Sequence, residues 1–346
     1  MIGARSLLSN RGVRELKNKV VVITGASAGV GRATARAFAR EGAKIALLAR
    51  DPERLEATRR EVEAAGCAAC AISVDVADAT AVERAAEQIE AQLGPIEIWV
   101  NNAMTTVFGR FEDLTDEEFK RVTEVTYLGT VYGTRAALKR MRGRDRGVIV
   151  QVGSALAYRG IPLQSAYCGA KHAARGFTDS IRTELMHEQS RIHITMVHLP
   201  AVNTPQFDWC VNRMPRRAQP VPPIFEPELA ADAVLWAARH RRRELYVGWP
   251  ALKTIVGNKA LPAVGDAMAA DDAWEGQMTP EAQIQHRDGN LFHPVPGAYA
   301  AHGRFDDQAK RRSIQLWTTF HRTPLLVGAS LLAAAGATLW WRRARA

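Results

Sequence analysis

The chain has 346 residues, of which 47% are apolar and 24% are charged, as in an ordinary globular protein. This length can bury a full core and predicts one large α/β domain with appended segments. The formal net charge of +10 indicates an anionic partner, such as a nucleic acid, an anionic lipid or a nucleotide cofactor. The arginine clusters carry no zinc-finger or RNA-binding signature, so we expect no nucleic-acid partner.

The cysteines predict neither a metal site nor a redox centre. Four are spread through the chain, and although Cys67 and Cys70 form a C-x-x-C, no second pair has zinc-finger spacing. We interpret them as structural thiols of a protein in a reducing compartment. The histidines also show no spacing typical of metal ligands, and we expect no metal.

The first element in chain order is a strand that leads into a glycine-rich turn. Residues 19–24, KVVVIT, form a β-branched apolar run typical of a buried parallel strand. Gly25, Gly29 and Gly31 follow, and residues 32–40 then have helical periodicity. Glycines let the backbone approach a pyrophosphate, and a helix N-terminus favours its charge. The sequence therefore predicts a dinucleotide cradle here.

An arginine follows the second predicted strand, residues 44–49, at the position that usually distinguishes NAD(H) from NADP(H). A cofactor without a 2′-phosphate usually meets an acidic residue just past this strand, whereas an arginine accommodates the phosphate. Arg50 stands there and favours NADP(H); the alternative is a surface arginine that binds no cofactor. Asp51 is expected to cap the helix that begins at Pro52.

Strands and helices then alternate, which predicts a Rossmann-type doubly wound parallel sheet of about seven strands. Asp75 and Val76 close the third strand and are predicted to contact the adenine edge. Asn101, Asn102 and Ala103 end the fourth, where asparagine can serve both the strand end and a cofactor wall. The further strands are expected at 68–74, 96–100, 148–152, 191–198 and 244–249, and the further helices at 52–65, 79–93, 115–141 and 227–240.

The chemistry is predicted to lie in residues 154–171, SALAYRGIPLQSAYCGAK. Tyr167 and Lys171 are four residues apart, so they share one face of a helix. A lysine cation one turn away favours the phenolate and lowers the pKa of the phenol, which suits proton transfer. Ser154, at a strand end, can hydrogen-bond the same substrate oxygen. A surface tyrosine and lysine on an ordinary helix are the alternative, because this motif alone is common.

Parts of the chain after residue 205 depart from this alternation. Residues 206–225 are rich in proline, arginine and aromatic residues and are predicted to include a substrate loop. We expect an irregular extension over 251–322. Residues 325–341 contain no charge and are flanked by arginines, which predicts a transmembrane or membrane-anchoring helix over 323–342; a buried or oligomer-forming helix is the alternative. Residues 1–17 are a leader without a secretory signal, leaving 18–250 as the catalytic domain.

Taken together, the motifs resemble the short-chain dehydrogenase/reductase family over about residues 17–250. They are TGASAGVG at 24–31, NNA at 101–103, and Ser154 thirteen positions before Tyr167 in YCGAK. The resemblance implies a nicotinamide cofactor and hydride transfer between its C4 and a carbonyl or alcohol carbon. Tyr167 would be the acid/base, Ser154 would polarise the oxygen, and Lys171 would hold the nicotinamide ribose. The implied cofactor-binding positions also include Gly25, Ser27, Gly29, Val30, Gly31, Asn102, Ala103, Val202 and Thr204.

Three residues depart from the family pattern. Met104 replaces a glycine after NNA, and Ala201 replaces the glycine after Pro200. Thr126 stands where the family usually has an asparagine that organises a water-linked proton relay to the lysine. We expect Thr126 to substitute in part through its backbone carbonyl.

The expected function is an NADP(H)-dependent oxidoreductase acting on an apolar carbonyl or alcohol, such as a lipid, sterol or retinoid-like compound. The resemblance also implies a homo-oligomer, and the apolar tail implies a membrane-associated protein with its catalytic domain on the cytoplasmic side. The alternative is a membrane-anchored sensor or scaffold that binds the cofactor with little turnover. Thr126 and Met104 favour that alternative, whereas the intact Ser154, Tyr167 and Lys171 oppose it.

Overall fold

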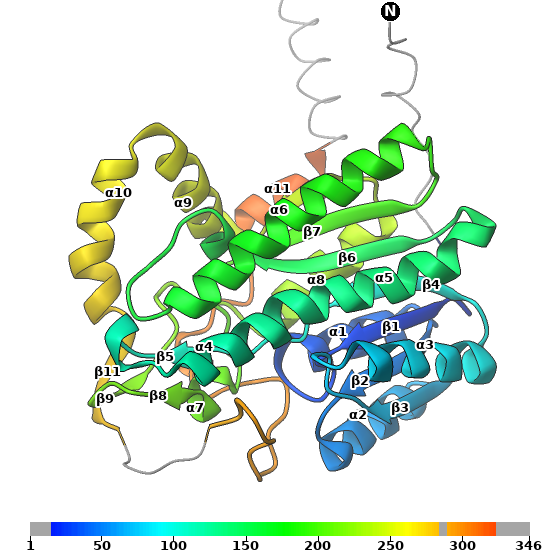
Figure 1. Ribbon diagram of the computed structural model, residues 1–346, viewed down its shortest axis with the longest axis horizontal. Helices are drawn as coiled ribbons and strands as arrows, with labels where there is room; N and C mark the ends of the chain where they lie inside the picture. The colour runs from blue at the N-terminus through cyan, green and yellow to red at the C-terminus, as the bar shows by residue number, and fades with distance from the viewer. Residues whose placement is uncertain (1–14, 284–288, 323–346) are drawn as a thin grey trace, which may run out of the picture.

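Seven parallel strands form the central sheet of the computed structural model, which describes residues 15–283 and 289–322. Their order across the sheet is β10-β7-β6-β4-β1-β2-β3 (Figure 1). The strands are β1 (Val20–Thr24), β2 (Lys44–Ala49), β3 (Ala69–Ser73), β4 (Ile96–Asn101), β6 (Val148–Ser154), β7 (His193–Leu199) and β10 (Glu244–Tyr246). Every neighbouring pair is parallel, so the predicted Rossmann-type sheet is confirmed.

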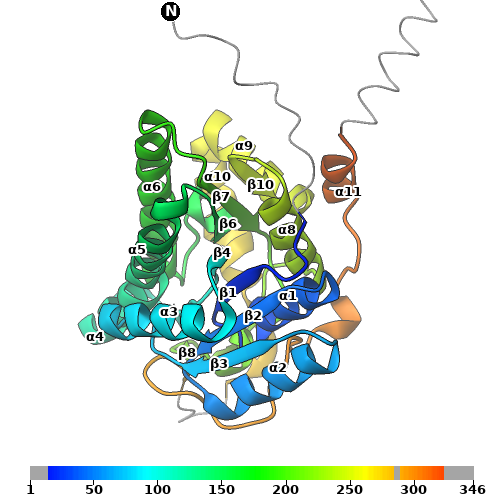
Figure 2. The same cartoon turned by 90° about the vertical axis from the view of Figure 1, so that its right-hand side faces the viewer.

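Helices cover both faces of this sheet, as Figure 2 shows. One layer contains α1 (Gly29–Arg40), α2 (Pro52–Ala64) and α8 (Pro227–Arg239). The other contains α3 (Ala79–Leu93), α4 (Asp116–Thr123), α5 (Gly129–Met141) and α6 (Ser165–His187). Shorter elements lie beyond the sheet: β5 (Val107–Phe108), α7 (Gln206–Trp209), β8 (Val211–Asn212) and β9 (Arg216–Ala218).

The helices begin where the sequence supplies a cap. The Asp51 carboxylate accepts the backbone N–H of Arg54 at the start of α2, and Asp78 does the same for α3. Thr115 and Glu118 form a reciprocal capping box at the start of α4. These side chains satisfy backbone N–H groups that have no partner inside the helix.

The core is divided by the sheet into two apolar layers. All five residues of β1 are buried. Val21 and Ile23 pack under α1 and α8, whereas Val20 and Val22 pack on the opposite side under α3 and α5. A fully buried aliphatic side chain contributes about 1.5–3 kcal/mol to stability. This two-sided burial explains why β1 reads as an uninterrupted apolar run.

The strand order reverses next to β1, and this reversal places the site. From β1 the chain proceeds outward through β2 and β3, and then crosses back to β4 on the other side of β1. The connections therefore diverge at the carboxyl ends of β1 and β4 and leave a crevice, the usual ligand position in such sheets. The predicted site residues at the carboxyl ends of these strands line this crevice.

The first part of the C-terminal extension is regular, contrary to our expectation of an irregular segment. α9 (Gly248–Ala260), α10 (Pro262–Met268) and a π-helical turn (Ala269–Ala273) form a projection that we call the arm, residues 248–273 (Figure 1, yellow). The arm lacks a clear apolar period because apolar residues such as Trp249 and Leu261 line a cavity and stay exposed. The predicted boundary at residue 250 therefore falls inside α9. β11 (Met278–Ala282) follows the arm and pairs antiparallel with β9.

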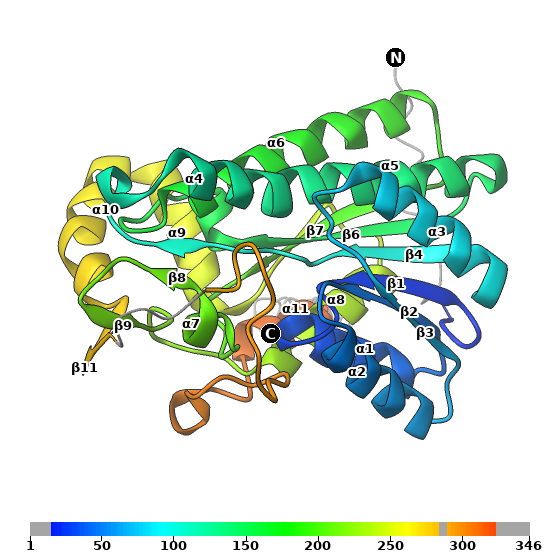
Figure 3. The same ribbon diagram turned by 60° about the horizontal axis from the view of Figure 1, so that its bottom comes forward.

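Residues 289–303 are irregular, as expected, and lie across the edge of the crevice. We call this segment the strap. Figure 3 shows it in orange between α7 and the side of the sheet that carries α1 and α2. It continues to α11 (Ile314–Phe320), the last helix that the structure describes.

The predicted membrane helix over 323–342 lies outside the described residues, as do residues 1–14 of the predicted leader. Within residues 15–283 and 289–322, no helix is both long and apolar enough to cross a bilayer. The described end of the leader is not separate from the domain, because Leu16 is only 2% exposed and packs in the core.

Candidate active site and cofactor cleft

A cavity of about 990 Å³ occupies the crevice and extends to the arm. This volume is at the upper end of ordinary ligand sites and suits a nucleotide together with a second molecule. Most of the predicted site residues line it: Gly25, Ser27, Gly29, Val30, Arg50, Asp75, Val76, Asn102, Ala103, Ser154, Tyr167, Lys171, Val202 and Thr204. Gly31 and Thr126, the other two, pack behind the wall.

The glycine-rich turn has backbone angles and close packing that favour glycine. Gly25 and Gly29 have φ angles of +65° and +54°, in the left-handed region that favours glycine. A Cβ at Gly31 would overlap the carbonyl oxygen of Gly25 and would lie 2.6 Å from the Asn102 Nδ2 atom. Gly25 and Gly29 line the cavity in front of the N-terminus of α1, a position that fits the pyrophosphate of a dinucleotide.

Asn102 and Thr24 fix this turn against the neighbouring strand. The Asn102 side chain donates to the carbonyl oxygen of Thr24 at 2.9 Å, and the Thr24 hydroxyl accepts from the backbone N–H groups of Asn102 and Ala103. Asn101, by contrast, is buried and donates to Gln151 at 2.9 Å. The two asparagines therefore divide the two roles expected for them: Asn101 is structural, and Asn102 belongs to the cavity wall.

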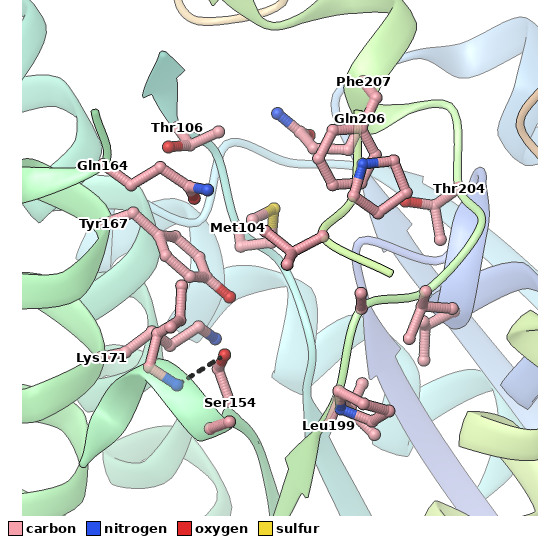
Figure 4. A pocket seen from close by; sticks show the side chains of 18 of the residues that line it. Met104, Thr106, Ser154, Gln164, Tyr167, Lys171, Leu199, Thr204, Gln206 and Phe207 are labelled. Carbon is pink, nitrogen blue, oxygen red and sulfur yellow. Dashed lines mark hydrogen bonds between the residues drawn. The ribbon is translucent and has the colours of Figure 1, made fainter. Parts of the chain in front are cut away.

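Ser154, Tyr167 and Lys171 converge on one wall of the cavity (Figure 4). Ser154 ends β6, and the other two lie one turn apart on α6, as the sequence predicted. The Tyr167 hydroxyl is directed into the cavity, above Lys171 and Ser154. Lys171 is buried, with its Nζ 5.6 Å from the Tyr167 ring centroid and donating to the carbonyl oxygen of Val152 at 2.7 Å.

Burial controls the protonation of both groups. It raises the pKa of Tyr167, an effect that a hydrogen bond from Ser154 opposes. Burial also lowers the pKa of Lys171 to about 8, so the amine is still largely a cation at neutral pH. The predicted lowering of the Tyr167 pKa by Lys171 does not overcome burial in this structure. A phenolate at Tyr167 needs stabilisation from the lysine cation and the serine hydroxyl together.

Thr126 does not face the cavity. It is fully buried in a π-helical turn (Glu124–Leu128) between α4 and α5. Its hydroxyl donates to the carbonyl oxygen of Thr105 at 2.9 Å and accepts the N–H of the same residue at 3.1 Å. Its own carbonyl oxygen accepts from the Thr130 hydroxyl. Thr126 thus ties the helix to the segment after β4, and its part in a proton relay remains a prediction.

Arg50 lies on the cavity wall, but its guanidinium is engaged by the strap. It donates to the backbone carbonyl oxygens of Asn290, Leu291 and Phe292. The two neighbouring arginines make ion pairs, Arg54 with Asp51 and Arg121 with Asp75. Within the part of the chain that the structure describes, Arg50 makes no ion pair, so it supplies the surplus positive charge at this end of the cavity.

One polar wall residue beside the catalytic candidates escaped the sequence reasoning. Gln164 precedes α6 and extends toward the cavity near Tyr167 (Figure 4). Its amide donates to Gln277, just before β11, at 2.6 Å. The three-residue spacing between Gln164 and Tyr167 was the available signal, because it places both on one side of the helix start.

A family model described as short chain dehydrogenase matches residues 19–211. The chain belongs to the short-chain dehydrogenase family. The matched part includes the glycine turn, Ser154, Tyr167 and Lys171, and it ends before the arm and the strap.

Similar proteins in this family are oxidoreductases. The chain is 33% identical over 332 residues to an uncharacterised oxidoreductase, YxnA, of Bacillus subtilis (strain 168), covering 95% of this chain and 91% of that protein. It is 36% identical over 198 residues to 3-dehydrosphinganine reductase of Danio rerio, covering 56% of this chain and 59% of that protein. An X-ray structure of an alcohol dehydrogenase from the archaeon Thermococcus sibiricus, complexed with 5-hydroxy-NADP, is 30% identical with a TM-score of 0.57, covering 66% of this chain and 95% of that one. The protein is a short-chain dehydrogenase/reductase enzyme that acts on a CH–OH or carbonyl group with a nicotinamide cofactor.

Proposed function

We propose that this short-chain dehydrogenase interconverts an apolar carbonyl and its alcohol with NADP(H), and that Tyr167 is the acid/base. The observation that carries the proposal is the meeting of Ser154, Tyr167 and Lys171 in the same cavity as the glycine turn. The turn would hold the pyrophosphate, Lys171 the nicotinamide ribose, and Thr204 the carboxamide. The nicotinamide, when bound, supplies the hydride for reduction or accepts it in oxidation.

The chain's own residues manage the proton. In reduction, the Ser154 hydroxyl donates a hydrogen bond to the carbonyl oxygen, and Tyr167 gives that oxygen its proton. Tyr167 is left as a phenolate, which the Lys171 cation stabilises. In oxidation, the phenolate takes the proton of the alcohol. Burial raises the pKa of Tyr167 and so disfavours the phenolate, which makes the Lys171 charge important.

The pH dependence of reduction is expected to follow Lys171. Its pKa is lowered to about 8 by burial, so the cation is present below this pH and is lost above it. We expect kcat/KM for reduction to fall about tenfold per pH unit above pH 8, because the neutral amine no longer stabilises the phenolate. Initial rates between pH 6 and 10 measure this. The Lys171→Arg variant, whose guanidinium stays charged, should lose this fall; a wild-type profile that stays level to pH 9.5 would refute the assignment.

The proposal of an apolar substrate rests on the wall between the catalytic residues and the arm. Apolar side chains line this part of the cavity: Met104, Phe108, Leu156, Phe207, Leu261 and Met268. Two of them stand on the arm, where Leu261 and Met268 are 62% and 50% exposed. Such surface would gain free energy by contact with an apolar substrate. The similar reductase of Danio rerio carries 3-dehydrosphinganine in its name, which agrees with this class.

A series of ketones tests this substrate class. Each methylene that becomes buried contributes about 0.8 kcal/mol, so kcat/KM should rise at least about tenfold from 2-butanone to 2-decanone. Dihydroxyacetone, a hydrophilic carbonyl compound close in size to 2-butanone, should react poorly. NADPH oxidation followed at 340 nm gives the rates. Equal rates along the series, or a preference for dihydroxyacetone, would exclude the proposed substrate class while leaving the reaction type intact.

The preference for NADP(H) is supported by the charge balance near Arg50. The carboxylates of Asp51 and Asp75 are matched by Arg54 and Arg121, so the Arg50 cation remains to meet a 2′-phosphate. The similar Thermococcus structure holds an NADP derivative.

We expect Arg50→Ala to weaken NADPH binding by at least about tenfold while NADH binding changes less than about twofold, because a charge-assisted hydrogen bond to phosphate is lost. Titration of the intrinsic fluorescence with each cofactor measures both affinities. Arg36→Ala, which removes an arginine paired with Glu61 outside the cavity, is the control. An equal loss of affinity for both cofactors would mean that Arg50 acts only by holding the strap.

Membrane association and self-association belong to the same proposal. The uncharged sequence 325–341 supports the first, and so do the exposed apolar side chains near the described C-terminus, where Ile314 and Trp317 of α11 are 84% and 53% exposed. A homo-oligomer is proposed from the family resemblance alone.

A further inference from the structure

The strap forms the outer wall of the cavity at its Arg50 end, and it is held there through its backbone. Arg50 and Arg121 bind the carbonyl oxygens of residues 290–292, with Arg121 at 3.1 Å from that of Leu291. Further along, Arg54 donates to the carbonyl oxygens of Val295 and Gly297, at 2.6 and 3.2 Å. The backbone N–H of Gly29, which belongs to the glycine turn, donates to the carbonyl oxygen of Ala300 at 3.0 Å.

This attachment fixes the position of Asn290 in the cavity wall. The backbone N–H of Asn290 donates to the carbonyl oxygen of Trp209 at 2.7 Å, and the next residue, Leu291, is only 1% exposed in an apolar cluster. Asn290 is itself only 8% exposed and lines the cavity. It is therefore a built part of the wall and not a surface residue that happens to lie nearby.

The Asn290 side chain lacks the partner that its burial requires. Its Oδ1 atom is buried and has no hydrogen-bond partner among the residues that the structure describes. Buried polar side-chain atoms nearly always have a partner, because an unsatisfied one loses its bonds to water without replacement. The residues that share this end of the wall include Arg50, Asp75 and Val76. Arg121 is paired with Asp75 and Arg50 donates to the strap backbone, and a bound ligand with a donor group would satisfy Oδ1.

The carboxamide of Asn290 indicates which part of a ligand it can bind. Asparagine presents an acceptor and a donor side by side, the arrangement that pairs with the amino group and a ring nitrogen of adenine. We propose that Asn290 binds the adenine base of the nucleotide cofactor, with Oδ1 accepting a hydrogen bond from its exocyclic amino group. The proposal rests on nucleotide binding in this cavity, which is part of the proposed function, and it assigns a base-reading residue from outside the matched family segment, residues 19–211.

The test compares two cofactors that differ at this amino group. The second is the reduced form of nicotinamide purine dinucleotide phosphate, which carries a hydrogen atom where NADPH carries the amine. We expect wild type to bind NADPH about three- to tenfold more tightly than the purine cofactor, because no rotation of the Asn290 carboxamide restores the lost hydrogen bond. Asn290→Leu should bind the two within about twofold of each other. Fluorescence titration of the purified full-length protein reports binding without any requirement for turnover.

Two further variants keep the outcome interpretable. His293→Ala alters an exposed residue of the same strap and should keep the wild-type preference. Asn290→Asp retains an acceptor and should also keep a preference for NADPH, which guards against an Asn290→Leu variant that fails to fold. A wild-type preference that persists in Asn290→Leu, or that is lost in Asn290→Asp, would overturn the role of Asn290. If wild type binds neither cofactor, nucleotide binding itself fails, and that result is distinct from the others.

Discussion

Replacement of Tyr167 by phenylalanine is expected to reduce turnover by about 10²–10⁴-fold, the usual contribution of a positioned acid/base. The substitution removes only the hydroxyl, which points into the cavity beside Ser154 and Lys171. Binding of NADPH should stay within about threefold of wild type, because the glycine turn and the Arg50 end of the cavity are unchanged. Steady-state rates at 340 nm and a fluorescence titration measure the two effects separately.

Tyr158→Phe provides the matched control for this result. Tyr158 is also a buried tyrosine, and its hydroxyl donates to Glu244 at 2.5 Å, away from the cavity wall. Its removal should cost stability but leave turnover within a few-fold of wild type. A Tyr167→Phe enzyme that keeps more than a tenth of the wild-type rate would exclude Tyr167 as the acid/base.

Gly31→Ala is expected to damage both folding and cofactor binding. The added Cβ would overlap the carbonyl oxygen of Gly25 and approach the Asn102 side chain, which holds the same turn through Thr24. Because the nearest obstacle is backbone, the turn must move. Overpacking of this kind typically costs about 1–3 kcal/mol of unfolding free energy. We expect NADPH affinity to fall at least about tenfold as the cradle is displaced, measured by chemical denaturation and by titration.

Gly176→Ala separates this packing effect from the general effect of replacing a glycine. Gly176 lies within α6, and a Cβ there would meet nothing within 4 Å. Alanine in a helix interior should raise stability by about 0.5–1 kcal/mol and leave NADPH affinity unchanged. If Gly31→Ala behaves like Gly176→Ala, the glycine turn is not the pyrophosphate cradle.

The sheet and its glycine turn could be predicted because their signals are local. A β-branched run such as residues 19–24 is buried on both faces, so apolar character and strand length specify it directly. The capping residues Asp51 and Thr115 mark helix starts within a few residues of their partners. The spacing of Tyr167 and Lys171 likewise lies within one helical turn.

The role of the strap could not be predicted, because it depends on contacts between distant segments. Arg50 donates to the backbone carbonyl oxygen of Asn290, which is 240 residues away in the chain. Every residue has a backbone carbonyl oxygen, so the sequence does not indicate which one accepts this bond. The rule predicted Arg50 at the cofactor, and the structure places it on the cavity wall, but the rule could not reveal that the strap uses its N–H groups. The helices of the arm could not be predicted for a related reason. Their apolar residues line the cavity, so these residues do not recur with a helical period in the sequence.

Thr126 illustrates a different limit. Helical periodicity over 115–141 predicted one continuous helix, and a π-helical turn changes that pattern by only one residue. The turn directs Thr126 toward the backbone of Thr105 instead of the cavity. A side chain's direction near such a turn depends on tertiary packing, which the local sequence does not encode.

The most direct test of the central claim is transfer of the nicotinamide hydrogen to a carbonyl carbon by this enzyme. The measurement uses NADPH deuterated at C4 on each face in turn, with 2-decanone as substrate and mass spectrometry of the alcohol. We predict one deuterium at the carbinol carbon from one face of the cofactor, and at least about 100-fold less deuterated alcohol when Tyr167→Phe replaces wild type under the same conditions. Tight NADPH binding without alcohol formation from any ketone of the series would contradict the account and favour a cofactor-binding protein without turnover.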